Sequence, residues 1–437
     1  MTSGGLEWLL SFSDVKRGVG WNTASRGGLE ANLRRTRVLL DLAGAPDRSM
    51  KIVLVAGTKG KGSTAAMLAS ILAASGVRAG LATKPHLQSY RERIRVDGAA
   101  IDDATLDVRI AALRPLVNGL TRRLPEAGSP TTFELTSVLA YMHFAAERCE
   151  VAVVEVGLGG KFDATNAADP HVSVITAISR DHARELGTKL AGIATQKAGI
   201  VRPGRVAVIA PQPADARAAI FSACERAAAV RREVAALSMS AAHGLALRGA
   251  HQRANASAAI AAAEALAEHG VGYTKDASAR GIASLEWPGR FEIVPGTRVI
   301  VLDGAHNDGS AEALARTLRA EFPRRRFHFI LGLMAEKDAR AVLGPLLPIA
   351  GAIEVTQPRS PRALAAGDLA TAIARSRGLV KKVVAIRTHA DVASAIAAAR
   401  RDARAEAVVC VTGSLALVGE ARDVLGLPVA ERLWPRR

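Results

Sequence analysis

Short apolar runs alternate with longer segments of helical period along most of the chain. The runs that we predict to be strands span residues 52–56, 79–82, 151–156, 172–177, 206–210, 299–302, 327–331, 353–356, 383–386 and 408–412. Each run is apolar at nearly every position, which is typical of parallel strands that are buried on both faces. Helical segments lie between them, among them residues 63–75, 255–269, 310–319 and 390–400. This alternation predicts an α/β fold with mostly parallel sheets.

A Trp-Pro-Gly-Arg segment at residues 287–290 interrupts both the helical and the strand period. Pro-Gly pairs are strong breakers of regular structure, and a new strand–loop–helix series begins near residue 298. We therefore expect a larger N-terminal domain over residues 1–288 and a smaller, Rossmann-like α/β domain over residues 289–437. The size of the second lies within the usual range for a domain.

Composition places the chain among globular proteins. Of its 437 residues, 49% are hydrophobic and 23% are charged, which excludes extended disorder. The three cysteines are far apart and argue against a disulfide scaffold or a structural zinc site, and so favour a reducing compartment. The first residues do not resemble a secretory signal, and no apolar run reaches the ~20 residues of a membrane span. We expect a cytoplasmic protein without a membrane segment.

The formal net charge of +17 raises the question of nucleic-acid binding. The arginines are scattered through alanine-rich segments, and the Arg-Arg-Arg run at residues 324–326 has no aromatic residues interleaved for base stacking. Aromatic residues make up only 4% of the chain. We therefore do not expect a nucleic-acid partner, although the charge would attract small anionic substrates.

A glycine-rich segment between a predicted strand and a predicted helix carries the clearest chemical signal. It reads Gly57-Thr58-Lys59-Gly60-Lys61-Gly62-Ser63-Thr64. Glycines let backbone amides turn toward a phosphate, and the helix N-terminus adds the positive end of its dipole. Lys61 is placed to reach the β- and γ-phosphates of a nucleotide, while Ser63 or Thr64 can face the nucleotide or its Mg²⁺. An extra glycine separates the lysine from the hydroxyls, unlike the common P-loop spacing.

Polar residues at other strand ends could complete such a site. Glu155 ends a buried strand, where ligand sites of parallel sheets lie, and a carboxylate there suits Mg²⁺. A capping role in a turn is the alternative. His182 also follows a strand, although a single histidine is more often structural. Lys197, taken alone, would be a solvated helix charge.

These segments together resemble one protein family. Residues 57–63 resemble the phosphate loop of the Mur ligase superfamily, and the Lys-Gly-Ser form resembles that of folylpolyglutamate synthase and dihydrofolate synthase. Further segments follow in the family's order: Pro-His-Leu at 85–87, Arg-Glu-Arg-Ile-Arg-Val-Asp-Gly at 91–98, Thr-Phe-Glu at 132–134, Glu-Val-Gly-Leu-Gly-Gly-Lys-Phe-Asp-Ala-Thr-Asn at 155–166, Asp-His at 181–182, Lys-Ala-Gly-Ile at 197–200, His-Gln at 251–252 with Asn255, Trp-Pro-Gly-Arg at 287–290, Leu-Asp-Gly-Ala-His-Asn at 302–307 and Val-Thr-Gly-Ser-Leu at 411–415.

The resemblance implies a role for each matching residue. Residues 1–288 would be the ATP-binding domain and residues 289–437 the glutamate-ligase domain. Glu155 and His182 would hold Mg²⁺, and Lys197 would be carbamylated. The residues implied in catalysis are Lys61, Lys197 and His182. The implied ATP contacts are loop 57–64, Asn255, Arg290, Asp303 and His306. The implied substrate contacts are Thr132, Phe133, Glu134, Phe162, Asp163 and Ala164.

Three residues depart from the family pattern. The family usually has Asn at the position of Lys59, Ser at that of Lys84 and Pro at that of Asp308. The serine is a metal ligand in the family's enzymes, and an ammonium cannot ligate Mg²⁺. Lys84 therefore changes the expected coordination of the first metal while leaving the fold unaffected.

The implied reaction is ATP-dependent amide formation between dihydropteroate or a folate and L-glutamate, through an acyl phosphate, in an enzyme that we expect to be monomeric. Three alternatives remain at this point. The chain could be a Mur-type ligase for another carboxylate and amino acid. It could be a nucleotide-binding protein without ligase activity, as Lys84 suggests. A nucleic-acid-binding protein would rest on charge alone.

Overall fold

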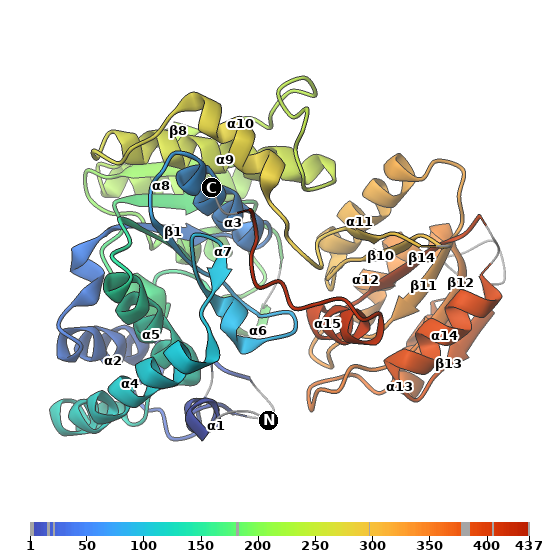
Figure 1. Cartoon of the computed structure of the whole chain (residues 1–437), viewed down its shortest axis with the longest axis horizontal. Helices are drawn as coiled ribbons and strands as arrows, with labels where there is room; N and C mark the ends of the chain where they lie inside the picture. The colour runs from blue at the N-terminus through green and yellow to red at the C-terminus, as the bar shows by residue number, and fades with distance from the viewer. Residues whose placement is uncertain are drawn as a thin grey trace.

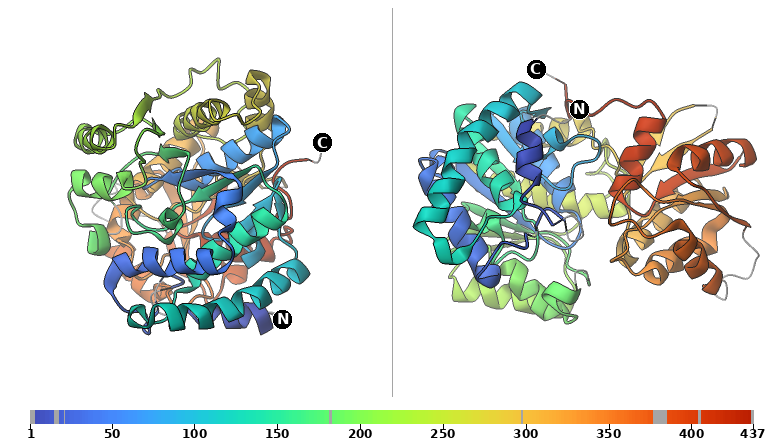
Figure 2. Two further views of the ribbon diagram at one scale, coloured as in Figure 1. Left: turned by 90° about the vertical axis from the view of Figure 1, so that its left-hand side faces the viewer. Right: turned by 90° about the horizontal axis from the view of Figure 1, so that it is seen from below.

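A computed structural model describes residues 4–14, 18–20, 22–180, 183–296, 298–376, 385–403 and 406–435. The chain forms two bodies side by side, each built around one sheet (Figures 1 and 2). The predicted α/β class with mostly parallel sheets is confirmed. No helix in the described part of the chain is long and apolar enough to cross a membrane.

The first sheet has eight strands in the order β4-β3-β2-β5-β1-β6-β7-β8. Parallel pairing joins β2 to β8 through β5, β1, β6 and β7, whereas β3 is antiparallel to β2 and to β4. Because β1 is central, its residues Val53, Leu54 and Val55 are fully buried. The strands are β1 (Lys51–Ala56), β2 (Ala79–Ala82), β3 (Ile94–Val96), β4 (Ala99–Ala100), β5 (Val151–Glu155), β6 (Val172–Ile175), β7 (Val206–Ile209) and β8 (Val230–Glu233).

Helices cover both faces of this sheet. Val172 and Val174 share a core with α3 and the alanine-rich α9, whose small side chains let the two helices pack closely. Ile175, on the opposite face of β6, packs with α7 and α8. The helices are α1 (Gly4–Leu10), α2 (Gly28–Leu42), α3 (Lys61–Ala74), α4 (Asp103–Arg123), α5 (Thr132–Ala146), α6 (Ala183–Leu186), α7 (Leu190–Ala198), α8 (Ala214–Arg226), α9 (Ala250–Ala267) and α10 (Lys275–Ser284).

The second sheet has six strands in the order β13-β12-β11-β14-β10-β9. Only β9 runs antiparallel to its neighbour among the described strand pairs. The strands are β9 (Glu292–Val294), β10 (Ile300–Leu302), β11 (Phe327–Leu331), β12 (Ala350–Val355), β13 (Ala385–Thr388) and β14 (Val408–Thr412). The helices are α11 (Asp308–Glu321), α12 (Ala339–Leu346), α13 (Ala366–Arg375), α14 (Val392–Asp402) and α15 (Leu415–Val424).

Some strands carry no apolar run and were not predicted. The edge strand β8 reads Val-Arg-Arg-Glu and is mostly exposed, so it lacks the signal of a buried strand. The short strands β3, β4 and β9 have two or three residues each. The predicted strand 383–386 begins with two residues outside the described part, and β13 starts at Ala385.

The end of the chain returns to the first sheet after α15 (Figure 1). The amide of Ala100 donates to Glu431 O at 2.8 Å, and the amide of Leu433 donates to Gly98 O at 3.1 Å. Leu433 and Trp434 are buried in the core that contains α3 and α9. The tail therefore packs with the first body, which is formed by the first two-thirds of the chain.

A buried ion pair fastens α2 to α5. Arg35 Nε donates to Glu134 Oε2 at 2.7 Å, and Arg35 Nη2 donates to Glu134 Oε1 at 2.7 Å. Both side chains are 1% exposed. Arg35 Nη1 also donates to Ala127 O at 2.8 Å. The geometry is bidentate and satisfies groups that water cannot reach, so loss of one partner would leave a charge buried alone.

We predict that Arg35→Met lowers the free energy of unfolding of the first body by about 3–5 kcal/mol, because it leaves the Glu134 carboxylate buried without its charged partner. Urea denaturation followed by circular dichroism measures the loss. Arg34→Met is the matched control. Arg34 pairs with Glu126 on the surface at 2.9 Å, and such pairs contribute about 1 kcal/mol or less. Equal losses in the two variants would contradict the assignment.

Candidate active site

The carboxyl ends of β2, β5, β1 and β6 lie next to one another in the first sheet. Lys84 follows β2, Glu155 ends β5, the loop 57–60 follows β1, and Thr176 follows β6. Val55 and Glu155 are register partners on β1 and β5. Sequence segments that are 100 residues apart thus meet at the edge of a parallel sheet where ligands usually bind.

Two glycines of the loop after β1 lie where a side chain would not fit. Gly57 and Gly60 have φ values of 149° and 84°, which side chains disfavour. A Cβ at Gly57 would overlap Thr176 Oγ1, and one at Gly60 would overlap Asn255 Oδ1. Helix α3 begins directly after Gly60, which offers no side-chain cap to the first amides. These amides and the helix dipole form a cradle for an anion.

Two opposite charges flank this cradle. Lys61 Nζ lies 3.9 Å from Glu155 Oε1 and 3.5 Å from Thr58 O. Glu155 Oε2 accepts a hydrogen bond from the amide of Lys84 at 3.0 Å. Within the described residues, the buried Thr64 Oγ1 has no hydrogen-bond partner, and Ser63 is buried one residue earlier. A cation, a carboxylate and two hydroxyls therefore surround the start of α3.

These residues fit a nucleotide and its Mg²⁺. Mg²⁺ commonly takes one or two protein carboxylates together with phosphate oxygens and water, and Glu155 supplies one. The described residues contain no cluster of three or more His, Cys, Asp or Glu side chains that could hold a metal. His182, the second predicted ligand, lies outside the described residues, so its role stays a prediction.

Lys84 contributes charge to the site. A cavity of about 20 Å³, enough for one water, is lined by Lys84, Glu155, Arg93, Phe133 and Ser137 among others. Burial, followed by the nearby Lys61 ammonium, lowers the pKa of Lys84 to about 8, so Lys84 is still mostly protonated at pH 7. An ammonium has no lone pair for a metal. Lys84 therefore brings a positive charge, and no metal-ligating atom, to this cavity.

Arg93 is a residue to which the sequence analysis assigned no role. Its Nε donates to His86 Nδ1 at 2.9 Å, and its guanidinium lies 4.9 Å from the centre of the Tyr90 ring. Burial and the Arg93 charge lower the pKa of His86 to about 3 and keep this imidazole neutral. The Arg-Glu-Arg motif was visible in the sequence, but nothing local indicated which arginine is buried.

Lys197 reaches the phosphate loop from α7. Its Nζ donates to Gly57 O at 2.8 Å, and the side chain is buried. The same end of α7 holds the segment 157–166, because the amide of Lys161 donates to Gln196 O at 2.7 Å. A Cβ at Gly160 would lie 2.7 Å from Lys197 O. The helix end therefore fixes two loops of the site at once.

Within the segment 157–166, Asp163 organises the backbone. Its carboxylate accepts hydrogen bonds from the amides of Leu158 at 2.7 Å and Thr165 at 3.1 Å. Phe162 is half-buried beneath the Lys161 ammonium, and Ala164 is buried. The predicted substrate contacts of Phe162, Asp163 and Ala164 stay predictions.

The predicted Thr-Phe-Glu group divides between scaffold and site. Thr132 Oγ1 donates to Leu9 O at 2.8 Å, and Glu134 forms the buried pair with Arg35. Phe133 lines the small cavity beside Lys84, and its ring would lie 2.5 Å from a Cβ at Gly157. Phe133 is thus the member of this group that faces the site.

The second body contributes residues at the end of β10. The Asp303 carboxylate accepts hydrogen bonds from the amides of Phe291 at 2.8 Å and Ala305 at 2.9 Å. Burial raises the pKa of Asp303, and the nearby Arg290 opposes that shift. His306 Nδ1 lies 2.7 Å from Gly304 O. A carbonyl can only accept, so Nδ1 carries a proton and donates it to Gly304 O.

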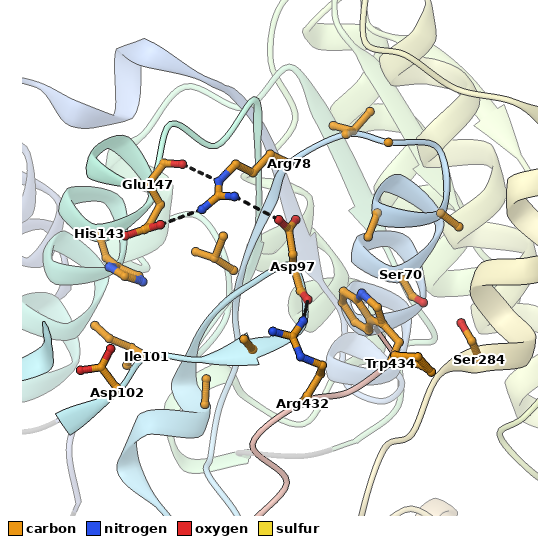
Figure 3. Close-up of a pocket in the computed structure, with 18 of the residues that line it drawn as sticks. Ser70, Arg78, Asp97, Ile101, Asp102, His143, Glu147, Ser284, Arg432 and Trp434 are labelled. Carbon is orange, nitrogen blue, oxygen red and sulfur yellow. Dashed lines mark hydrogen bonds and ion pairs between the residues drawn. The ribbon is translucent and has the colours of Figure 1, made fainter. Parts of the chain in front are cut away.

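A larger cavity of about 940 Å³ lies elsewhere (Figure 3). The tail residues Arg432 and Trp434 are part of its lining. Two other lining residues, Arg78 and Glu147, form an ion pair with 2.7 Å between Nη2 and Oε2. None of the predicted site residues lines this cavity. The candidate site at the loop, Lys61 and Glu155 is therefore not the larger of these two cavities.

Two family models match this chain. The Mur ligase middle domain matches residues 55–263, and the Mur ligase glutamate ligase domain matches residues 289–415. Dihydrofolate synthase/folylpolyglutamate synthase of Mycobacterium tuberculosis is 35% identical, over 91% of this chain and 91% of that protein.

Two solved structures have the same fold. Folylpolyglutamate synthase of Mycobacterium tuberculosis, complexed with ADP and AMPPCP, has a TM-score of 0.84 and 34% identity over 91% of this chain and 96% of that chain. The bifunctional folylpolyglutamate synthase/dihydrofolate synthase of Yersinia pestis c092, complexed with AMPPNP and Mn ion, has a TM-score of 0.81 and 28% identity. That match covers 98% of this chain and 99% of the other.

We predict that Lys61→Ala weakens binding of a non-hydrolysable ATP analogue by roughly 10- to 100-fold, the effect of losing a hydrogen bond to a charged group. Isothermal titration calorimetry measures the affinity. Lys51→Ala is the control, because Lys51 begins β1 and lies at the end of that strand away from the loop; it should bind as the unaltered protein does. Near-normal affinity in a folded Lys61→Ala variant would remove the phosphate-loop assignment.

Proposed function

This chain belongs to the dihydrofolate synthase/folylpolyglutamate synthase family of Mur ligases, and we propose that it joins L-glutamate to dihydropteroate and to reduced folates. As a member of this family it is an ATP-dependent ligase. The observation that carries the proposal is the meeting of the glycine loop, Lys61, Glu155 and Lys197 at the carboxyl ends of the central strands.

The chemistry explains why ATP is needed. A carboxylate resists attack by an amine because it is anionic and its leaving group would be oxide. Transfer of the γ-phosphoryl group to the carboxylate gives an acyl phosphate with ADP as the other product. The glutamate amine then attacks the acyl carbon, the C–O bond to phosphate breaks, and an amide and inorganic phosphate result. The protein's task is to position the reactants and to neutralise phosphate charge.

Each part of the site has a place in this scheme. The amides at the start of α3 and the Lys61 ammonium bind the phosphates. Glu155, the Ser63 hydroxyl and the predicted ligand His182 would hold Mg²⁺, which when bound neutralises phosphate charge. Lys84 and Arg93 line the water-sized cavity beside Glu155, and their positive charge would attract the acceptor carboxylate to this end of the site. Asn255, Arg290, Asp303 and His306 would bind the rest of the nucleotide and help exclude water from the acyl phosphate.

We place the acceptor against Phe133 and Phe162. The face of Phe162, which does not line the water-sized cavity, suits the flat ring system of a pterin. The charge of Lys84, with Phe133 beside it, suits the carboxylate at the other end of the acceptor. Asp163 and Ala164 shape the loop that carries Phe162. In this arrangement Thr132 and Glu134 hold Phe133 in position through their contacts with Leu9 of α1 and Arg35 of α2.

Lys197 is proposed to be carbamylated in the active enzyme. A carbamate keeps one N–H, so the hydrogen bond to Gly57 O can persist after the modification. The added carboxylate-like group would bring negative charge to a metal near the loop.

We further assign residues 1–288 to the ATP-binding domain and residues 289–437 to the glutamate-ligase domain, with the tail returning to the first. The buried, unpaired cysteines Cys149, Cys224 and Cys410 are consistent with a reducing compartment, and we place the reaction in the cytoplasm of the cell. A monomer accounts for the reaction, because every proposed contact comes from one chain.

The product assay tests the function directly. The protein is incubated with ATP, L-glutamate and either dihydropteroate or tetrahydrofolate, and products are weighed by mass spectrometry. We expect one added glutamate on dihydropteroate and one or more on the folate. The same assay in CO₂-depleted buffer, with and without added bicarbonate, tests the carbamylation of Lys197. If Lys197 is carbamylated, activity should depend on the bicarbonate. If neither acceptor yields a product, the result would favour a Mur-type ligase for another carboxylate, or a nucleotide-binding protein without ligase activity.

We predict that Lys84→Ser lowers turnover at saturating Mg²⁺, because the variant loses a positive charge that acts beside the phosphates. Steady-state rates over a Mg²⁺ titration measure this. Lys84→Met removes the same charge without adding a ligand oxygen and should lose at least as much turnover. Unchanged or improved turnover and Mg²⁺ dependence in Lys84→Ser would mean that the ammonium adds nothing to the site.

A further inference from the structure

The side chain of Lys59 leaves the phosphate loop and reaches the second body. The Lys59 amide remains in the loop and donates to Ala177 O at 3.1 Å. Its Nζ lies 3.6 Å from Asp308 Oδ1. Asp308 is the first residue of α11 and follows the segment that carries Asp303 and His306. The ion pair therefore spans the space between the loop and the nucleotide-facing end of β10.

Gly309 makes room for this ammonium. A Cβ at position 309 would overlap Lys59 Nζ. The backbone of Gly309 does not have a positive φ, so its conformation is open to any residue, and a glycine in a helix costs stability relative to alanine. A side chain at position 309 would displace the Lys59 ammonium from the place it occupies beside Asp308. Asp308 offsets the disfavoured position of a cation at a helix N-terminus.

The pair is suited to being broken. The Lys59 side chain is 23% exposed and the Asp308 side chain is 56% exposed, and ion pairs in that setting are weak. A nucleotide in the loop would bring several negative charges near the same ammonium. Those charges compete with one carboxylate, and Lys is a good partner for phosphate as a point charge.

We propose that Asp308 is a positioning residue that holds the Lys59 ammonium while the loop is empty, and that the phosphates of a bound nucleotide take Lys59 over from Asp308. The proposal rests on the proposed function, because it requires a nucleotide at this loop. Two of this chain's three departures from the family pattern, Lys59 and Asp308, are complementary charges that meet. Asp308 therefore lowers the affinity for nucleotide and draws Lys59 back when the product leaves.

A double-mutant cycle tests the exchange. Binding of AMPPCP, which does not turn over, is measured by calorimetry for the unaltered protein, Asp308→Asn, Lys59→Gln and the double variant. We expect Asp308→Asn to bind about two- to fivefold more tightly, the equivalent of a weak ion pair, and Lys59→Gln to bind more weakly. The double variant should match Lys59→Gln, because Asp308 acts through Lys59.

A control variant separates the pair from general charge effects. Glu312→Gln removes an exposed carboxylate on the same helix, one that pairs with Arg316 at 3.2 Å, and should leave the affinity unchanged. Unchanged or weaker binding in Asp308→Asn overturns the proposal, as does a gain that persists without Lys59. If the unaltered protein binds no AMPPCP, the proposed function fails together with this proposal, whereas binding without these effects overturns this proposal alone.

Discussion

The hydrogen bond from Lys197 to the carbonyl of Gly57 joins the phosphate loop to the end of α7. A buried amine requires a partner, and here the partner is the backbone at the point where β1 ends. The same turn of α7 binds Lys161, which lies in the segment that follows β5. The phosphate loop and the segment after Glu155 are thus held in one arrangement by a single helix end, and the rest of the site is built around that arrangement.

Charges around the loop are arranged as pairs that a polyphosphate can enter. Lys61 faces Glu155, Lys59 faces Asp308, and Asp303 lies near Arg290. The net charge of the chain is strongly positive, yet its effect at the site is set by these few neighbours. Binding of a nucleotide is therefore an exchange of partners as much as an attraction between opposite charges.

Local patterns in the sequence predicted the elements whose structure depends on neighbouring residues. The apolar runs gave the central strands, because a strand buried on both faces must be apolar throughout, and the glycine spacing gave the phosphate loop. Glu134 shows where such patterns stop. Its motif suggested a substrate contact, whereas its partner Arg35 lies 99 residues away in the sequence. The burial of Arg93 and the strand β8 were missed for the same reason, because burial and strand pairing there depend on segments that are distant in the sequence.

The return of the tail makes the second body an insertion within the first. Residues before β9 and residues after α15 both belong to the first core, to which Leu433 and Trp434 contribute near the very end of the chain. During synthesis the second body emerges and can fold while the first core still lacks those side chains. The first core is completed only after Leu433 and Trp434 leave the ribosome, so the nucleotide-binding body reaches its final packing after the body inserted into it has emerged.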